Sequence, residues 1–180
     1  MLLAKKTQHN FEYFLLNKES SDSREEIYRL WYDIYSKEMK RNLKYANHID
    51  KTLIDTLEPH SHIVIAANKN KIIGTFRINL PEDCDLGYYN ELYQLESFRP
   101  HEIAIGTRYM VSPDYRGNYI SQGLMMSAIR FLANIGKKYL IIDCNSPIHN
   151  LFKKMGFNEY LEERYSHEFG TVRIMKYRIK

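Results

Sequence analysis

The sequence contains almost no cysteine and no long apolar run, and each absence excludes a class of protein. Cys84 and Cys144 are its two cysteines, too few for the disulfide framework that holds small secreted domains together. No run of residues approaches the ~20 apolar residues that are needed to cross a bilayer. Residues 1–8 offer neither an apolar core nor a small-residue cleavage site of the kind found in leader peptides. We therefore expect a cytoplasmic protein without an integral membrane segment.

Repeats, low-complexity tracts and linkers are also missing, so the 180 residues are expected to form one domain, residues 1–180. Hydrophobic residues make up 44% of the chain and charged residues 27%, which is ordinary for a globular protein. The net charge of +4 suits an acidic ligand or an acidic carrier protein and does not indicate a nucleic-acid partner. The 15 tyrosines either line a polar–apolar cleft or reflect biased codon usage. A monomer and a homodimer are both compatible with this composition.

Alternating and apolar segments predict a mixed sheet with interspersed helices. Strands are expected at residues 11–16, 61–67, 71–80, 102–111, 139–144, 157–164 and 170–179. Helices are expected at residues 24–39, 90–95, 119–136 and 147–155. This order predicts an α/β fold, more narrowly an α+β mixed central sheet with helices on both faces. Ligands of such sheets bind near the carboxyl ends of the central strands.

Local signals mark where the helices begin and end. Ser23 and Glu26 have the spacing of a capping box. Ser146 followed by Pro147 predicts an N-cap with proline at the first helical position, and Gly136 marks the end of the preceding helix. The two long helices are expected to bury one stripe each, formed by Ile27, Leu30, Trp31, Ile34 and Tyr35 and by Ile120, Leu124, Ala128, Phe131 and Ile135.

The most informative segment is residues 107–123. An apolar strand runs into a proline-containing turn, Arg116 and Gly117 follow, and the next helix has no acidic residue in its first turn. A helix N-terminus offers backbone N–H groups without helical partners and a partial positive charge, and both favour phosphate. Arg116 adds a guanidinium group that pairs with phosphate through two N–H donors. The segment therefore predicts a site for a phosphate-bearing ligand.

Three segments, in this order, resemble the GNAT superfamily of N-acyltransferases. The run YMVSPDYRGNYIS at residues 109–121 resembles the acyl-CoA signature of that superfamily. The runs IIDCN at 141–145 and FKKMGF at 152–157 resemble its next strand and its fourth helix. The order of elements matches over nearly the whole chain, so the resemblance implies a GNAT-like domain that binds an acyl thioester. It implies no metal.

A narrower resemblance lies in the first half of the chain. The runs IYRLWYDIY at 27–35 and GTFRI at 74–78, with Thr107 and Arg108, look like the branch that contains acyl-homoserine-lactone synthases and N-acyl amino acid synthases. That branch implies transfer of a long acyl chain, from acyl-CoA or acyl carrier protein, to an amino group. It also implies that Arg77 and Arg108 lie in or near the acceptor pocket, where arginine suits a substrate carboxylate.

The resemblance also implies which residues bind the donor. Tyr119 and Ser121 stand where the superfamily usually has small residues. A tyrosine can crowd the diphosphate of coenzyme A, and a carrier protein, which brings a single phosphate, asks less of the loop; the alternative is a loop that bulges outward. The expected donor-binding residues are Met110, Val111, Arg116, Gly117, Asn118, Tyr119, Ile120, Ser121 and Asn145.

The usual acid and base of the superfamily are not at their usual positions. Phe152 stands where many relatives have a tyrosine that protonates the leaving thiolate, and Ile105 stands where the synthase branch has a glutamate. Glu102 is our candidate base, because it has the same strand parity as Arg108; the alternative is a solvated glutamate at the start of a strand. His101 is a second candidate. Positioning and backbone hydrogen bonds are expected to carry much of the rate.

Further candidates have a functional and an ordinary interpretation. Asp50, with Asp55, lies in a loop over the expected cleft and either holds an ammonium group or is solvated. Trp31, which replaces an arginine of the synthase branch, and Tyr35 either border an acyl tunnel or belong to the core. His60 and His62 lack a convincing third ligand, which favours a solvated edge over a metal site. Cys144 ends an apolar strand and is expected to be a buried structural cysteine.

Together these features predict an N-acyltransferase of the GNAT fold. The donor would be an acyl-CoA or acyl carrier protein thioester with a medium or long chain. The acceptor would be an amine of an amino acid, a small metabolite or a peptide side chain. Two alternatives remain, an acetyl-CoA-dependent N-acetyltransferase and a non-catalytic module that binds an acyl donor.

Overall fold

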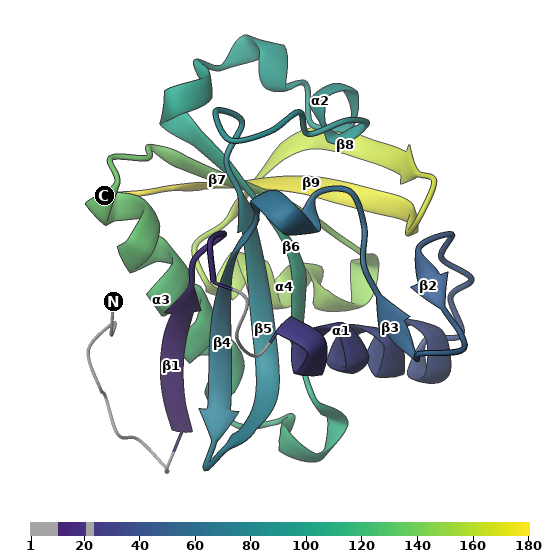
Figure 1. Cartoon of the computed structure of the whole chain (residues 1–180). Coiled ribbons are helices and arrows are strands. Elements are labelled where there is room, and N and C mark those ends of the chain that lie inside the picture. Colours follow the sequence, from purple (N-terminus) through teal and green to yellow (C-terminus); the bar gives the residue numbers. More distant parts are fainter. Residues whose placement is uncertain (1–10, 21–23) are drawn as a thin grey trace. The chain divides into compact units, whose positions relative to one another are not determined.

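A computed structural model describes residues 11–20 and 24–180 of the chain (Figure 1). Most of the described strands form one mixed seven-stranded sheet in the order β1-β4-β5-β6-β7-β9-β8, which confirms the predicted fold class. The strands of this sheet are β1 Phe11–Leu16, β4 His62–Asn68, β5 Lys71–Asn79, β6 Ile103–Val111, β7 Tyr139–Cys144, β8 Asn158–Ser166 and β9 Gly170–Arg178. The α-helices are α1 Arg24–Tyr32, α2 Tyr89–Leu92, α3 Ile120–Asn134 and α4 Ser146–Lys154.

The chain divides into two compact units. The first contains the residues up to Arg77 together with Arg108–Ser127, and the second contains Ile78–Thr107 and Ala128–Lys180. Strands β5 and β6 and helix α3 each contribute residues to both units.

In the first unit, an antiparallel pair of strands carries the apolar side of helix α1. Strand β1 pairs with β4 from Phe11 opposite Asn68 to Leu16 opposite Ile63, and its bounds match the prediction. Ile27, Trp31 and Ile34 of the predicted helical stripe are buried in one cluster with residues of β4 and β5, while Leu30 and Tyr35 are partly buried at its margin. Each fully buried side chain of this size contributes about 1.5–3 kcal/mol by burial.

The helix predicted at residues 24–39 changes its hydrogen-bonding pattern before it ends. Helix α1 stops at Tyr32 and continues as a π-helix, η1, Asp33–Glu38. Ser23 of the expected capping box lies outside the described residues. The carboxylate of Glu26 accepts a hydrogen bond from the backbone N–H of Ile72 at 2.8 Å. Glu26 thus ties the helix to the start of β5.

The segment between η1 and β4 is less irregular than predicted. Two short strands, β2 Ala46–Asn47 and β3 Thr52–Leu53, form an antiparallel hairpin. At its tip, Asn47 Oδ1 accepts hydrogen bonds from the N–H groups of Ile49 and Asp50 at 3.0 and 3.1 Å. The side chain of Asn47 therefore organises this turn.

In the second unit, strand β7 lies between β6 and β9, as its apolar sequence predicts. It runs parallel to β6, from Ile103 opposite Tyr139 to Gly106 opposite Ile142. It runs antiparallel to β9 from Tyr139 opposite Arg178 to Cys144 opposite Arg173. The predicted bounds of β7, residues 139–144, match the structure.

Two helix boundaries differ from the prediction. The N-cap of α4 is Asn145, so Ser146 is already helical, because the extended backbone before the helix extends only to Asn145. Helix α3 ends at Asn134 and the left-handed Gly136 (φ +77) closes it. Ile135, which we expected on the buried stripe, lies after the helix and is 44% exposed. The other four residues of that stripe are buried.

Aromatic residues of the second unit gather around polar groups. Tyr93 is fully buried, its hydroxyl donates to Asp143 Oδ1 at 2.5 Å, and burial followed by the charge of Asp143 raises its pKa. The ammonium of Lys176 lies 4.4 Å from the ring centroid of Tyr160 and 5.3 Å from those of Phe98 and Tyr139. These tyrosines contribute to packing. Their positions favour neither of the two explanations for the high tyrosine content, a polar–apolar cleft or biased codon usage.

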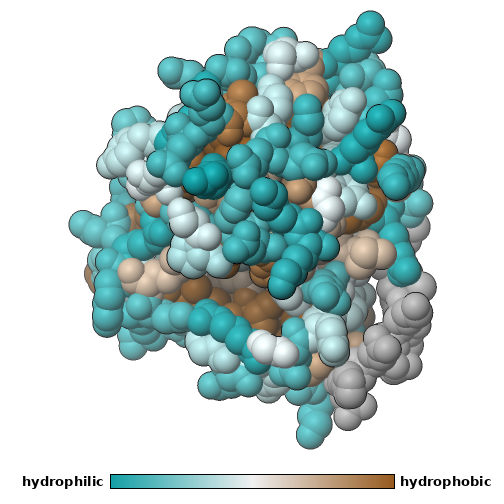
Figure 2. Space-filling view, turned by 180° about the vertical axis from the view of Figure 1, so that it is seen from behind, coloured by the Kyte–Doolittle hydropathy of each residue, from teal (hydrophilic) through white to brown (hydrophobic). Residues whose placement is uncertain are grey.

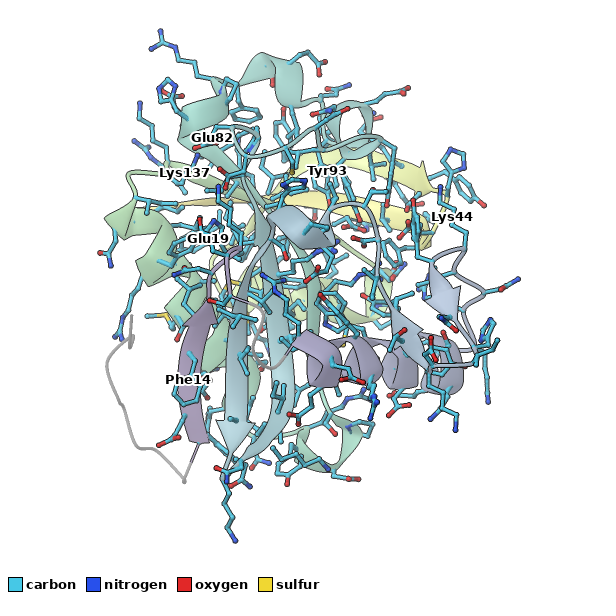
Figure 3. The ribbon with its side chains drawn as sticks, in the orientation of Figure 1. Phe14, Glu19, Lys44, Glu82, Tyr93 and Lys137 are labelled. Carbon is cyan, nitrogen blue, oxygen red and sulfur yellow. The ribbon has the colours of Figure 1, made fainter. Side chains whose placement is uncertain are left out.

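An ion pair fixes the segment after α3 in the same unit. The nearly buried Lys137 donates from Nζ to the carboxylate of Glu82 (Figure 3) and, at 3.4 Å, to the carbonyl of Pro100. The face drawn in Figure 2 is mostly hydrophilic, with smaller apolar patches among the hydrophilic residues. Among residues 11–20 and 24–180, no helix is long and apolar enough to cross a membrane.

A close approach between β1 and α3 makes Gly123 sensitive to substitution. A Cβ at Gly123 would fall well inside contact distance of the Tyr13 ring. Gly123→Ala should therefore lower the free energy of unfolding by about 1–3 kcal/mol through overpacking, although alanine normally stabilises a helix interior relative to glycine by about 1 kcal/mol. Urea denaturation of the variant would measure this change. Adding Tyr13→Ala should remove the penalty of the new Cβ, and a single Gly123→Ala variant more stable than the wild type would contradict the close approach.

Candidate active site

Strand β6, which enters the predicted phosphate loop, contains an unusual backbone conformation. Arg108 has φ +52, the left-handed region, within a strand. A left-handed residue interrupts the alternation of side chains between the two faces of a strand. Glu102 lies before the strand, in the 3-10 turn η4 Pro100–Glu102. The strand-parity argument for Glu102 therefore does not apply, because Glu102 lies before the strand and Arg108 interrupts the alternation of the strand. Glu102 as the base stays a prediction.

The side chain of Arg108 belongs to a buried cluster of charged residues in the first unit. Arg108 Nη2 donates to Asp55 Oδ2 at 2.7 Å, and Arg77 Nη1 donates to Asp55 Oδ1 at 2.5 Å. The side chains of Arg77, Arg108 and Asp55 are 0%, 1% and 7% exposed. Asp55 Oδ1 also accepts the N–H of Leu57 at 3.1 Å. Two guanidinium groups therefore converge on one carboxylate.

The electrostatics of this cluster keep Asp55 ionised. Burial alone would raise the pKa of Asp55, but the charges of Arg77 and Arg108 and their hydrogen bonds outweigh burial and hold the pKa well below its usual range. Removing either type of partner would leave a charge in the interior, which is strongly destabilising.

Aromatic rings cover the two guanidinium groups. Arg77 Cζ lies 5.4 Å from the ring centroid of Trp31, and Arg108 Cζ lies 4.7 Å from that of Tyr35. Trp31 Nε1 donates to Thr75 Oγ1 at 2.9 Å, and that hydroxyl donates to the carbonyl of Arg108 at 3.1 Å. The structure thus brings together four of the residues assigned to the acceptor side, Trp31, Tyr35, Arg77 and Arg108, and adds Asp55.

Asp50, the fifth residue assigned to the acceptor side, lies apart from this cluster. It is exposed at the tip of the β2–β3 hairpin, where its Oδ2 accepts a hydrogen bond from Asn47 Nδ2 at 2.7 Å. Asp55 carries the buried carboxylate instead.

The loop after β6 contains several backbone N–H groups that have no protein acceptor among the described residues. The N–H of Ser112 donates to the carbonyl of Ile73 at 2.7 Å, which fixes the start of the loop on β5. Gly117 has φ +81, a conformation that glycine adopts without strain. Within the described part of the chain, the N–H groups of residues 117–122 donate to no protein acceptor. The first turn of α3 contains no acidic residue.

Tyr119 and Ser121, which stand where the superfamily usually has small residues, have different surroundings in this loop. Tyr119 is 71% exposed, so the loop carries this ring outward into solvent. The carbonyl of Ser121 accepts a hydrogen bond from the Tyr109 hydroxyl at 2.6 Å, which fixes the first turn of α3 to β6. Burial raises the pKa of Tyr109, so this hydroxyl stays protonated and remains a donor.

Arg116 forms an ion pair with Glu38, a contact that we did not predict from the sequence. Its Nη1 and Nη2 donate to the two carboxylate oxygens of Glu38 at 2.6 and 2.8 Å, and its Nε donates to the carbonyl of Val111 at 3.0 Å. The hydrogen bond from Arg116 lowers the pKa of Glu38. The arginine that we predicted to bind phosphate therefore has a carboxylate of the same chain in its fork.

Within the second unit, the parallel ladder between β6 and β7 ends at Gly106 and Ile142. The expectation that the backbone at Met110 and Val111 binds the donor stays a prediction.

The candidate base of the second unit lies in an ion pair. Glu102 Oε1 accepts a hydrogen bond from Lys138 Nζ at 2.7 Å, and this bond lowers the pKa of Glu102. A carboxylate held in this way is a weaker base than a free one. His101 lies beside it in the same exposed turn.

The side chains of the other predicted residues of this unit contact other parts of the same unit. Asn145 Nδ2 donates to the carbonyls of Phe169 and Thr171 at 3.1 and 3.0 Å. Phe152 is 2% exposed and packs edge-on against Phe157. Burial raises the pKa of the Cys144 thiol to about 11, so this cysteine is a neutral buried side chain. In residues 11–20 and 24–180, no three His, Cys, Asp or Glu side chains are placed to hold a metal ion.

Comparison with protein families agrees with this geometry. The model of the acetyltransferase (GNAT) family matches residues 24–157. The chain therefore belongs to the GNAT family and is an acyltransferase, which confirms the resemblance seen in the sequence. No curated protein sequence matches the chain.

Solved structures share the fold at low sequence identity. The CoA-dependent acyl-homoserine lactone synthase MesI has a TM-score of 0.74 and 18% identity, over 94% of this chain and 89% of MesI. The CoA-dependent synthase BjaI, solved with SAM and isopentyl-CoA, has a TM-score of 0.76 and 16% identity, over 92% and 82%. FeeM, an N-acyl amino acid synthase from uncultured soil microbes, has a TM-score of 0.69 and 13% identity, over 94% and 91%. These matches confirm the fold that the narrower resemblance predicted.

Proposed function

We propose that this acyltransferase moves a medium- or long-chain acyl group from a phosphopantetheine thioester, acyl-CoA or acyl carrier protein, to an amine. The amine would belong to an amino acid, a small metabolite or a peptide side chain. The observation that carries the proposal is the loop after β6, where the N–H groups of residues 117–122 meet no protein acceptor in the described chain. Similarity to synthases of acyl-homoserine lactones and N-acyl amino acids supports the choice of substrates.

The loop fits the phosphate of such a donor. Its open N–H groups lie at the N-terminus of a 15-residue helix, whose dipole adds a partial positive charge there. The left-handed Gly117 lets the backbone approach a phosphate closely. The exposed Tyr119 leaves the inner side of the loop to the ligand.

The reaction requires few side chains. The neutral amine attacks the thioester carbonyl, the C–N bond forms, the C–S bond breaks, the thiolate leaves, and the amine loses one proton to solvent or the thiolate. Backbone N–H groups at Met110 and Val111, which the resemblance assigns to the donor, would stabilise the oxyanion. A positioned oxyanion donor is worth about 2.7–4 kcal/mol of barrier, so the backbone supplies a large part of the catalysis.

Arg77 and Arg108 would support the acceptor side of the site without contacting the substrate. Their side chains are 0% and 1% exposed and hold Asp55, so they lie too deep to bind a substrate carboxylate directly. We assign them to shaping β5 and β6 behind the site. Their positive potential would still favour an acceptor that carries a carboxylate.

One observation favours a shorter donor, acetyl-CoA. Trp31 is 0% exposed and lies in one buried cluster with Ile27 and Leu53, which favours a core residue over the border of an acyl tunnel. An acetyl group would need no such tunnel.

A donor panel tests the proposed function. Purified protein would be incubated with acetyl, octanoyl and hexadecanoyl thioesters of CoA and carrier protein and with a panel of amines, and amides would be detected by mass spectrometry. Amides from the longer donors are the expected result. Faster turnover of acetyl-CoA would select the acetyltransferase, and binding of donors without any amide would contradict the proposal.

Arg116→Ala tests the donor loop. Loss of a charge-assisted hydrogen bond to phosphate, worth about 1.5–3 kcal/mol, should weaken CoA binding by about tenfold or more. Isothermal titration calorimetry with CoA would measure the change. Arg130→Ala is the matched control, because Arg130 is an exposed arginine farther along α3, and its affinity should equal that of the wild type. Equal affinity for Arg116→Ala would contradict the assignment of the loop.

A further inference from the structure

The contact between Arg116 and Glu38 has the geometry of a bound anion. Two N–H donors of one guanidinium group meet two oxygens of one carboxylate, at 2.6 and 2.8 Å. An arginine fork pairs with a phosphate in the same two-point way. The carboxylate of Glu38 therefore occupies the donors of Arg116 that a phosphate would use.

The neighbouring backbone donors of the loop have no acceptor in the described chain. Glu38 takes the arginine fork, whereas the N–H groups of residues 117–122 donate to no acceptor in the described chain. Arg116 Nε holds the carbonyl of Val111 at 3.0 Å, which keeps the guanidinium at the mouth of the loop. An incoming phosphate would thus find the backbone cradle open and the arginine already paired.

We propose that Glu38 competes with the donor phosphate for Arg116 and thereby sets the affinity of the enzyme for its acyl donor. Donor binding exchanges one two-point anion for another: the carboxylate leaves the fork and the phosphate enters it. This inference rests on the proposed function, because it takes the loop after β6 as the donor site.

Burial and charge make this exchange feasible. The side chains of Arg116 and Glu38 are 46% and 38% exposed. An ion pair that is this accessible to water contributes little to stability, so its opening does not disturb the fold. A phosphate would bind both the Arg116 fork and the backbone N–H groups of the loop. The carboxylate of Glu38 on η1 binds the fork but none of these N–H groups.

The segment that carries Glu38 is suited to movement. Glu38 is the last residue of the π-helix η1, and π-helical turns are rare and often occur at functional sites. Lys37, Glu38 and Met39 are exposed, and Lys40 is in the left-handed region with φ +54. Rotation of the Glu38 side chain would therefore leave the core unchanged.

Glu38→Gln tests the competition, with Asp33→Asn as the matched control. Asp33 is on the same π-helix, and its carboxylate pairs with Lys37 at 2.5 Å and not with Arg116. Asp33→Asn therefore removes the same charge as Glu38→Gln without affecting the Arg116 pair. Titration calorimetry with CoA should show tighter binding for Glu38→Gln, by up to about fivefold given the strength of exposed ion pairs. Asp33→Asn should bind like the wild type. Glu38→Ala should bind at least as tightly as Glu38→Gln.

A double-mutant cycle shows whether the effect acts through Arg116. In the Arg116→Ala background, Glu38→Gln should give no gain in affinity. Equal or weaker CoA binding by Glu38→Gln in the wild-type background would overturn the inference, since Glu38 would then be neutral or would support Arg116. An equal gain in the Arg116→Ala background would overturn it as well.

The two proposals fail in different ways. If neither the wild type nor any variant binds CoA or forms an amide, the proposed function is wrong. If the wild type binds CoA and forms amides while Glu38→Gln binds CoA no more tightly, only the role of Glu38 is wrong.

Discussion

Asp55→Ala should lower the free energy of unfolding by about 3–5 kcal/mol, the usual cost of removing one partner from a buried ion pair. The carboxylate of Asp55 is 7% exposed and accepts hydrogen bonds from Arg77 and Arg108. Without it, two guanidinium groups would face each other in the interior. Urea denaturation at neutral pH would measure the loss.

Asp50→Ala is the control for this prediction. Asp50 is exposed at the hairpin tip, so its removal should change the unfolding free energy by less than about 0.5 kcal/mol. A loss at Asp55 no larger than that at Asp50 would contradict the buried cluster.

The contribution of Asp55 to the free energy of unfolding should depend on pH in a defined direction. The pKa of Asp55 is lowered in the folded protein, so Asp55 stabilises the fold fully above its unfolded pKa of about 3.9. That stabilisation is lost as pH falls through the folded pKa, progressively below about pH 5. The difference in stability between wild type and Asp55→Ala should therefore be constant from pH 6 to 8 and shrink in acid. Denaturation curves over this range would measure it.

Trp31→Ala should cost about 3–5 kcal/mol, as large aromatic truncations in cores do. Trp31 is fully buried, donates to Thr75 and covers Arg77. Trp31→Phe keeps most of the apolar volume and should lose about 1–2 kcal/mol through the unmade hydrogen bond to Thr75. Thermal and urea unfolding would rank the two variants.

The same pair of variants separates a core residue from the wall of an acyl tunnel. A core residue predicts that Trp31→Phe leaves the preference among acyl chain lengths unchanged. A shift in that preference, in a variant that stays folded, would instead place Trp31 beside the acyl chain.

Strands with a strong local signal could be predicted from the sequence. Strand β1 and strand β7 have the predicted bounds, because their apolar residues and flanking turns are encoded within a few positions. The loop after β6 could also be located, since Arg116, Gly117 and the following helix are adjacent in the chain. The expectation that Arg77 and Arg108 lie near one another followed from the resemblance and not from spacing.

Other features of the site depend on contacts that a sequence pattern does not contain. Glu38 and Arg116 are far apart in the chain and meet through tertiary packing. In the sequence, Asp55 and Asp50 are two aspartates of the same polar loop, and nothing there distinguishes them. Only the fold shows that Asp55 is buried and Asp50 is exposed. The left-handed Arg108 was unpredictable for a different reason, because arginine carries no preference for that conformation.

The left-handed conformation of Arg108 restricts what can replace it. Its backbone would suit glycine or asparagine, whereas its guanidinium group must reach Asp55 and lie against Tyr35. No other amino acid meets both demands. Lysine keeps the charge but not the fork, and glycine relieves the strain but leaves Asp55 with one guanidinium partner, Arg77. Substitution at this position is therefore a choice between two losses, one in the main chain and one in the side chain.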